Sequence, residues 1–239
     1  MRAFDDPTTR SFARMAGTLY LLIAGAGFFS ILYVPARLEV SGDPAAALDA
    51  IAAGPGLFIA GVGGDVVMML SEVVLAVMLF AMFRPYGAVL ATAALVARLM
   101  MAAVMAAMLL PQAAILAIAM DPHLAMDMAA RADLVWVLGR MDEAGVWVWQ
   151  VFFALHLWLL GVLAWRSRAV PPLLSVMLAV GGTGYLVDSI RAVAAPSSAV
   201  LGAVGGALLA IVTLAEIGFA LWLLSRGRVT PHARMADPA

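Results

Sequence analysis

Six long apolar segments run through the sequence. Each holds at least about 20 mostly hydrophobic residues, which is the length an α-helix needs to cross the hydrocarbon core of a bilayer. The segments are residues 15–34, 57–83, 87–110, 145–165, 172–193 and 199–224. The strands of a transmembrane barrel are shorter, about 10 residues, and alternate between apolar and polar side chains. The sequence therefore predicts an all-α integral membrane protein, a bundle of six transmembrane helices.

The composition excludes a water-soluble domain. Hydrophobic residues make up 65% of the 239 residues, charged residues make up 12%, and the mean hydropathy is +1.03. A typical soluble domain is about 25% charged, so this chain has too few polar residues to cover a surface in water. No internal repeat, low-complexity tract or linker divides the chain. We expect one six-span membrane domain over residues 1–239, with the lipid bilayer as its main partner.

The distribution of arginine predicts the orientation of the chain, because positively charged loops are retained on the cytoplasmic side. With the N-terminus inside, nine arginines lie on the inner face and four on the outer face. The inner set is Arg2, Arg10, Arg14, Arg84, Arg166, Arg168, Arg226, Arg228 and Arg234, and the outer set is Arg37, Arg131, Arg140 and Arg191. We therefore expect both termini to be cytoplasmic.

The two longer outer loops are each expected to carry a short interfacial helix. In the first loop, Asp43 can cap a helix that has Pro44 at its first position and ends at Gly54. The second loop, residues 121–143, mixes apolar side chains with charged ones such as Asp127. That pattern is typical of an amphipathic helix lying on a membrane surface.

Two residue types are absent, and their absence excludes several kinds of chemistry. There is no cysteine, so disulfides, iron–sulfur clusters and thiolate metal sites are excluded. All 14 basic residues are arginine, so no lysine can form a Schiff base with retinal or another carbonyl compound. Only His156 lies within a span, which disfavours a bis-histidine haem. We expect no cofactor and no metal site, and no nucleic-acid partner, because membrane orientation explains the arginines at chain ends and loops better.

Four ionisable residues lie deep inside predicted spans, and a charge at the bilayer centre costs at least about 2.5 kcal/mol. Glu72, Arg98 and His156 fall near the middle of the second, third and fourth spans, and Glu216 lies in the sixth. At this common depth Glu72 and Glu216 could share Arg98. The remaining negative charge could be balanced by a proton on His156 or on one glutamate. The sequence therefore predicts a binding site for a small molecule, an ion or a proton.

Further polar residues are secondary candidates for this site. Asp65 lies two helical turns before Glu72, nearer the outer surface, and Gln150 and Asp188 lie in the outer half of their spans. Asp188 is also three residues from Arg191, a spacing that predicts a local surface ion pair.

Three functions are compatible with this inventory. The first is binding of a small molecule or ion, with proton coupling as one form of it. The second is an intramembrane enzyme that acts on a lipid or isoprenoid-like substrate, with a protonated glutamate as general acid. The third is a structural or assembly protein in which the buried ion pair only fixes helix packing. A cavity lined by the polar side chains would favour binding or catalysis, and a closed cluster would favour structure.

Several short motifs recur in a fixed order along the chain. They are residues 14–22, 83–85, 184–188 and 220–224, together with Arg98, His156 and Glu216. Their order and spacing resemble the bacterial multi-pass membrane family known as domain of unknown function 4386. The resemblance covers nearly the whole chain and implies a six-span inner-membrane protein of undetermined molecular function. It adds Tyr185, which lies in the third of these motifs, to the secondary candidates.

Overall fold

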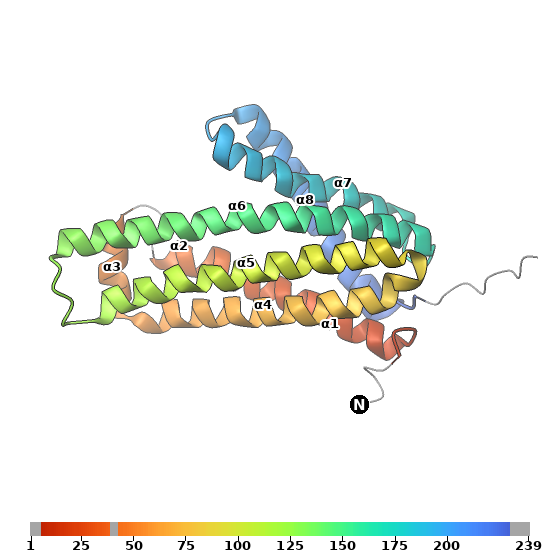
Figure 1. Cartoon of the computed structure of the whole chain (residues 1–239), viewed down its shortest axis with the longest axis horizontal. Helices are drawn as coiled ribbons and strands as arrows, with labels where there is room; N and C mark the ends of the chain where they lie inside the picture. The colour runs from red at the N-terminus through yellow and green to blue at the C-terminus, as the bar shows by residue number, and fades with distance from the viewer. Residues whose placement is uncertain (1–5, 39–42, 230–239) are drawn as a thin grey trace, which may run out of the picture.

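The computed structural model describes residues 6–38 and 43–229, and these residues are helical almost throughout (Figure 1). The α-helices are α1 Arg10–Gly27, α2 Val34–Leu38, α3 Pro44–Ala53, α4 Pro55–Phe83, α5 Ala88–Met120, α6 Met128–Ser167, α7 Pro172–Ala194 and α8 Ala199–Ser225. A π-helical segment, η2, joins α1 to α2 over Phe28–Tyr33, and a 3₁₀ turn, η3, follows α4 over Arg84–Tyr86. Six helical segments of the described residues are long and apolar enough to cross a membrane. The predicted fold class is confirmed.

Local sequence signals explain where the helices begin. Thr9, Asp43, Asp127 and Ser198 each accept a hydrogen bond from a backbone N–H group in the first turn of the helix that follows. Proline begins α3, α4 and α7, at positions where its missing N–H group is not needed. The predicted helix in the first long loop is confirmed as α3.

The second long loop differs from its prediction. Residues 128–143 do not form a separate interfacial helix, because they are the first turns of α6, a single helix of 40 residues that continues into the fourth span. No proline interrupts this stretch, and helix propagation continues where nothing breaks it. The preceding helix, α5, also runs beyond the predicted limit at Leu110, through Pro111 to Met120. At about 1.5 Å per residue, α6 is about 60 Å long.

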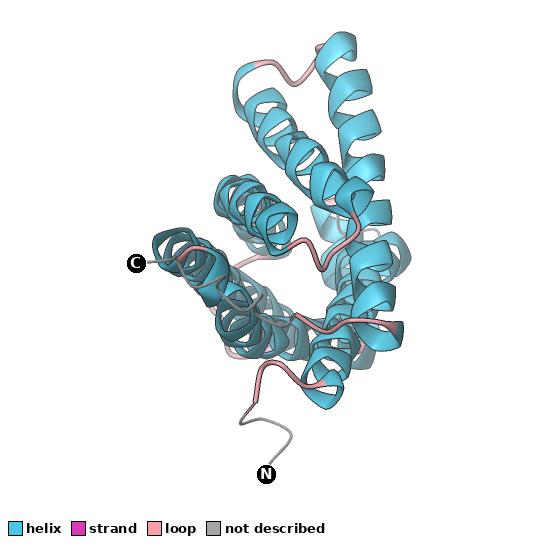
Figure 2. Ribbon diagram, turned by 90° about the vertical axis from the view of Figure 1, so that its right-hand side faces the viewer, coloured by secondary structure: helices cyan, strands magenta, loops and turns pink. Residues whose placement is uncertain are grey.

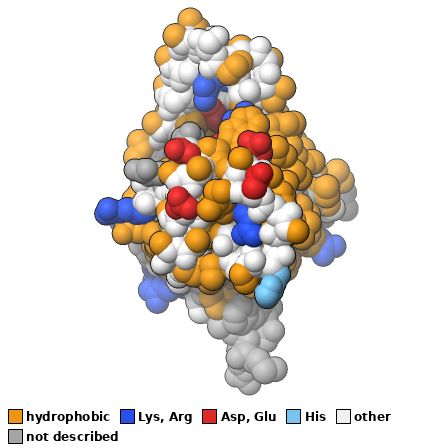
Figure 3. Space-filling model, turned by 90° about the vertical axis from the view of Figure 1, so that its left-hand side faces the viewer, with side chains coloured by type: hydrophobic (Ala, Val, Ile, Leu, Met, Phe, Trp, Pro, Cys, Tyr) orange, Lys and Arg blue, Asp and Glu red, His pale blue; other side chains and the backbone are white. Residues whose placement is uncertain are grey.

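Helices that are neighbours in the chain are also neighbours in space (Figures 1 and 2). The helix α8 packs against α7 and α1, and in the described part of the chain its backbone does not approach that of α5. We call the end of the molecule that carries α3 and the α5–α6 connection the α3 end. The opposite, terminal end holds the start of α1 and the end of α8, where Arg14 Nε donates to the carbonyl oxygen of Leu224 at 3.3 Å. The α7–α8 connection stands away from α5 and α6 as a separate lobe (Figures 1 and 3).

The two sets of arginines lie in different parts of the molecule. Arg2 and Arg234 lie outside the described residues, and the other seven of the inner set belong to the terminal end. The outer set of four lies on α2, α6 and α7, toward the opposite ends of these elements.

Glycines allow close approach between several helices. A Cβ atom on Gly181 of α7 would lie 2.7 Å from the backbone nitrogen of Val212 in α8. A Cβ on Gly161 of α6 would lie 2.8 Å from the carbonyl oxygen of Ser175 in α7. Small residues at such crossings let helix backbones pack together in a membrane.

Replacing Gly181 by valine is expected to destabilise the α7–α8 pair. The obstructing atoms are backbone, so the helices must move apart, which costs about 1–3 kcal/mol. Thermal unfolding in detergent measures the loss. Gly206→Val in α8 is the matched control, since a Cβ there meets no atom within 4 Å. Equal losses in the two variants would contradict the close packing at Gly181.

Candidate functional site

Arg98 is the centre of a closed cluster of polar side chains. Its side chain is 0% exposed, and its Nε donates to Glu72 Oε2 at 2.5 Å. Its Nη1 lies 3.2 Å from the hydroxyl of Tyr20 and 2.9 Å from Nε2 of His156. The guanidinium carbon lies 5.1 Å from the ring centre of Tyr20 and 5.5 Å from that of Phe153. Four helices, α1, α4, α5 and α6, therefore meet at one buried cation.

The hydrogen bonds of His156 determine its protonation. An arginine N–H group can only donate, so Nε2 of His156 must accept from Arg98. The ring proton is then on Nδ1, which donates to the backbone oxygen of Ala94 at 2.8 Å. His156 is therefore a neutral acceptor in this arrangement and carries no charge to balance a glutamate.

Glu216 does not join the ion pair. No arginine nitrogen of the described residues lies within 4.0 Å of its carboxylate, and its hydrogen-bond donor is the hydroxyl of Tyr185, 3.3 Å from Oε2. The predicted sharing of Arg98 by two glutamates does not occur. The physical reason is the position of α8, whose backbone packs on α7 and α1 and does not approach the backbone of α5, which carries Arg98.

A cavity of about 300 Å³ lies between α4, α5, α6 and the π-helical segment η2, in the half of the bundle nearer the α3 end. Its polar lining residues include Asp65, Gln112, Asp142 and Glu143. Its apolar walls include Phe58, Met68, Met105, Met108 and Trp149. Seen from the α3 end, acidic side chains are grouped on a surface that is otherwise largely apolar (Figure 3).

Gln112 bridges two carboxylates in this cavity. Its Nε2 donates to Asp65 Oδ2 at 3.0 Å and to Asp142 Oδ1 at 3.2 Å, so one side chain connects α4, α5 and α6. Asp65 Oδ1 and Gln112 Oε1 are buried without a hydrogen-bond partner in the described structure. Buried polar atoms are nearly always paired, because leaving one without a partner is costly. The cavity thus has two buried acceptors and needs a donor.

The predicted residues fall into three separate places. Glu72, Arg98 and His156 form the closed cluster, and the void of about 10 Å³ beside His156 is the size of one water molecule. Asp65 lines the large cavity. The other secondary candidates, Gln150, Tyr185 and Asp188, form a third group with Glu216.

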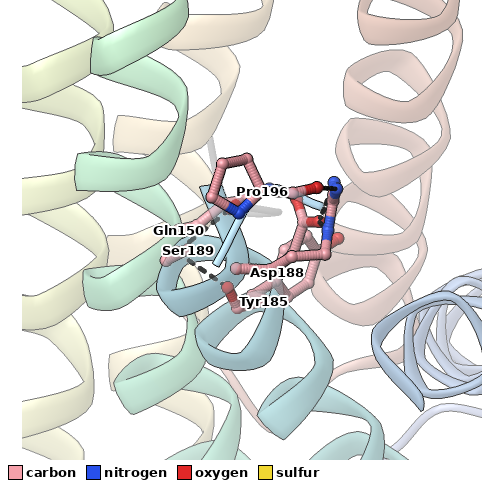
Figure 4. A network of polar contacts seen from close by, with 6 residues as sticks. Gln150, Tyr185, Asp188, Ser189 and Pro196 are labelled. Carbon is pink, nitrogen blue, oxygen red and sulfur yellow. Dashed lines mark hydrogen bonds and ion pairs between the residues drawn. The ribbon is translucent and has the colours of Figure 1, made fainter. Parts of the chain in front are cut away.

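This third group lies along α7 and connects to α6 (Figure 4). Gln150 Nε2 donates to Asp188 Oδ2 at 3.3 Å, and Ser189 Oγ lies 3.1 Å from Gln150 Oε1 and 2.8 Å from the backbone oxygen of Tyr185. Asp188 pairs with Arg191 at 3.0 Å, so the predicted local ion pair is confirmed.

Three lining residues of the cavity, Gln112, Asp142 and Glu143, are not among the candidates that the sequence predicts. Gln112 lies beyond the predicted end of the third span, and the two acidic residues lie in the predicted surface loop. The continuity of the helical stretch after Asp127, with no proline up to Ser167, is the signal that places them on α6. No group of three or more His, Cys, Asp or Glu side chains suited to hold a metal ion occurs in the described part of the chain.

Comparison with known proteins gives one match. No curated protein and no solved structure matches the chain. A protein family described as "Domain of unknown function (DUF4386)" matches residues 15–227. This range includes the buried cluster, the cavity and the Tyr185–Glu216 pair. Because the match covers most of the chain, the protein belongs to this family of multi-pass membrane proteins.

Proposed function

We propose that this membrane protein binds a small organic cation, a protonated amine with an apolar body, in the cavity between α4, α5 and α6. The observation that carries the proposal is the pair of unpartnered buried acceptors, Asp65 Oδ1 and Gln112 Oε1. An ammonium group supplies N–H donors to both and offsets the negative charge of Asp65 and Asp142. Hydrogen bonds between charged groups of this kind are the stronger ones in proteins.

The rest of the cavity suits the body of such a ligand. A volume of about 300 Å³ is at the lower end of the range of small-molecule pockets, roughly 300–1,000 Å³. Methionine side chains on α4 and α5 adapt to different apolar shapes, and Trp149 offers an aromatic face to a cation. The π-helical segment η2 forms part of the wall through Ser30 and Ile31, and such segments are frequent at functional sites.

The arginine distribution supports a cavity that faces outward. With seven described arginines at the terminal end, three on α2 and the first half of α6, and one near the end of α7, both termini are cytoplasmic in this proposal, and the α3 end faces the outside of a bacterial inner membrane. The ligand then enters from the outer side. Met68 is one helical turn from Glu72, so the closed cluster around Arg98 lies directly beneath the cavity and blocks the way through the bundle.

Binding of phenethylammonium to the purified protein in detergent, measured by calorimetry, tests the proposal. We expect phenethylammonium to bind and phenylacetate, which has a similar body and the opposite charge, not to bind. Asp65→Asn should weaken binding about 10- to 100-fold, because it removes the charge from one hydrogen-bonded acceptor. Asp188→Asn is the matched control outside the cavity and should bind as the wild type does. Equal binding by Asp65→Asn and wild type would overturn the proposal, and so would binding of phenylacetate alone.

A further inference from the structure

We propose that Glu216 is a second site, at which the protein takes up and releases a proton within the membrane, and that this proton is linked to the cation in the cavity. The proton site is inferred from the hydrogen bond of Glu216 to Tyr185 and from the absence of a nearby arginine in the described structure. The linkage rests on the proposed function.

The charges of the closed cluster around Arg98 balance without Glu216. Arg98 and Glu72 neutralise each other at 2.5 Å, and the hydrogen bonds of His156 make it neutral. Glu216 has no arginine within 4.0 Å among the described residues. An unpaired carboxylate within a membrane span is unfavourable. A proton on Glu216 removes this charge without a change in the fold.

The groups that face Glu216 come from four helices. Tyr185 of α7 donates its hydroxyl hydrogen to Glu216, and the hydroxyl of Tyr20 on α1 is the nearby titratable group from the other helix packed on α8. The charges of Arg98 on α5 and Glu72 on α4 also act on Glu216, but each already has the other as a direct partner. The Tyr185 hydrogen bond is compatible with both forms of Glu216, since a carboxyl oxygen accepts in either.

A polar route leads toward this carboxyl group. Glu216 is only partly buried, whereas Glu72 in the closed cluster is 4% exposed. From the α7–α8 connection, Asp188, Gln150 and Ser189 form successive hydrogen bonds that end at the backbone of Tyr185 (Figure 4). On deprotonation of Glu216, the proton passes to water at the partly exposed side of the residue and leaves a carboxylate that accepts from Tyr185.

An aromatic contact joins the proton site to the cavity. Trp149 lines the cavity, and its ring centre lies 5.8 Å from that of Tyr185. Phe153 packs edge-on against Tyr185, with ring centres 5.0 Å apart. A cation in the cavity and a proton on Glu216 both add positive charge to the same low-dielectric bundle, so each weakens the binding of the other. Cation binding should therefore release a proton.

Infrared difference spectroscopy of the full chain in vesicles, titrated with pH, tests the proton site without any ligand. We expect a carbonyl band of a protonated carboxyl group that appears reversibly as the pH falls and is lost in Glu216→Gln. The amide oxygen of this variant still accepts from Tyr185, so its fold should be retained. Asp133→Asn, at an exposed position of α6 outside the cavity, is the control and should keep the band. Carbonyl bands that are the same in Glu216→Gln and wild type, or a wild type with no titrating band, would overturn the proton site.

The linkage is tested by binding of phenethylammonium at several pH values. We expect binding to tighten with rising pH, with on the order of fivefold contributed by the titration of Glu216, and this contribution to be lost in Glu216→Gln. Binding with the same pH dependence in both proteins would overturn the linkage and leave the proposed function standing. Absence of phenethylammonium binding at every pH would overturn the proposed function and the linkage together, while the infrared titration decides the proton site separately.

Discussion

Replacing Arg98 by methionine is expected to destabilise the protein more than any other single change considered. The substitution keeps most of the apolar stem but removes the charge, so Glu72 stays buried without a partner. Breaking a buried pair in this way costs about 3–5 kcal/mol. Yield of monodisperse protein and unfolding temperature in detergent measure the effect.

The same substitution in a second background shows whether charge is the cause. In Arg98→Met with Glu72→Gln, no uncompensated charge is left, and most of the stability should return. Arg191→Met is the control, because its partner Asp188 is partly exposed and such pairs contribute about 0–1 kcal/mol. A double variant as unstable as Arg98→Met would show that packing of the guanidinium between Tyr20 and Phe153 matters more than the ion pair.

Filling the cavity from Gly139 should abolish cation binding without loss of stability. Gly139 lines the cavity, and a Cβ on it meets no atom within 4 Å, so the side chain of Gly139→Leu starts in open space beside the cavity. Leucine is also a better helix former than glycine, by up to about 1 kcal/mol. We expect phenethylammonium binding to weaken at least about 100-fold, equivalent to about 2.7 kcal/mol, with an equal or higher unfolding temperature.

A glycine outside the cavity provides the comparison. A Cβ on Gly63 of α4 would also meet no atom within 4 Å, but Gly63 is exposed and does not line the cavity. Gly63→Leu should bind phenethylammonium as the wild type does. If Gly139→Leu retains binding, the ligand does not occupy this cavity.

The bundle itself could be predicted because each span is a local property. Runs of apolar residues identify a membrane helix, and caps such as Asp43 identify its start. The ends of α5 and α6 could not be predicted in the same way. A length criterion taken from the bilayer stops at the hydrocarbon boundary, whereas these two helices continue because they pack against each other beyond it.

The buried charges were predictable for a related reason, since ionisable groups in apolar segments are rare and costly. The side chains that pair with these buried charges could not be predicted from the sequence. Tyr20 looks in sequence like an ordinary aromatic residue of a span, and its contact with Arg98 depends on how α1 lies against α5. The cavity residues Gln112 and Asp142 meet only through the relative register of α5 and α6. Register of this kind is set by packing between helices, which a single sequence does not display.

The length of α6 has a consequence for how a ligand would reach the carboxylates. Asp142 precedes the end of α6 at Ser167 by 25 residues, which is about 37 Å along the helix axis. The hydrocarbon core is about 30 Å thick. In the proposed orientation, with Arg166 at the inner edge of this core, Asp142 lies at the level of the opposite lipid headgroups, where water is present. A charged ligand could reach it without first being transferred into hydrocarbon, so entry to the cavity carries little of the electrostatic barrier that the membrane otherwise imposes.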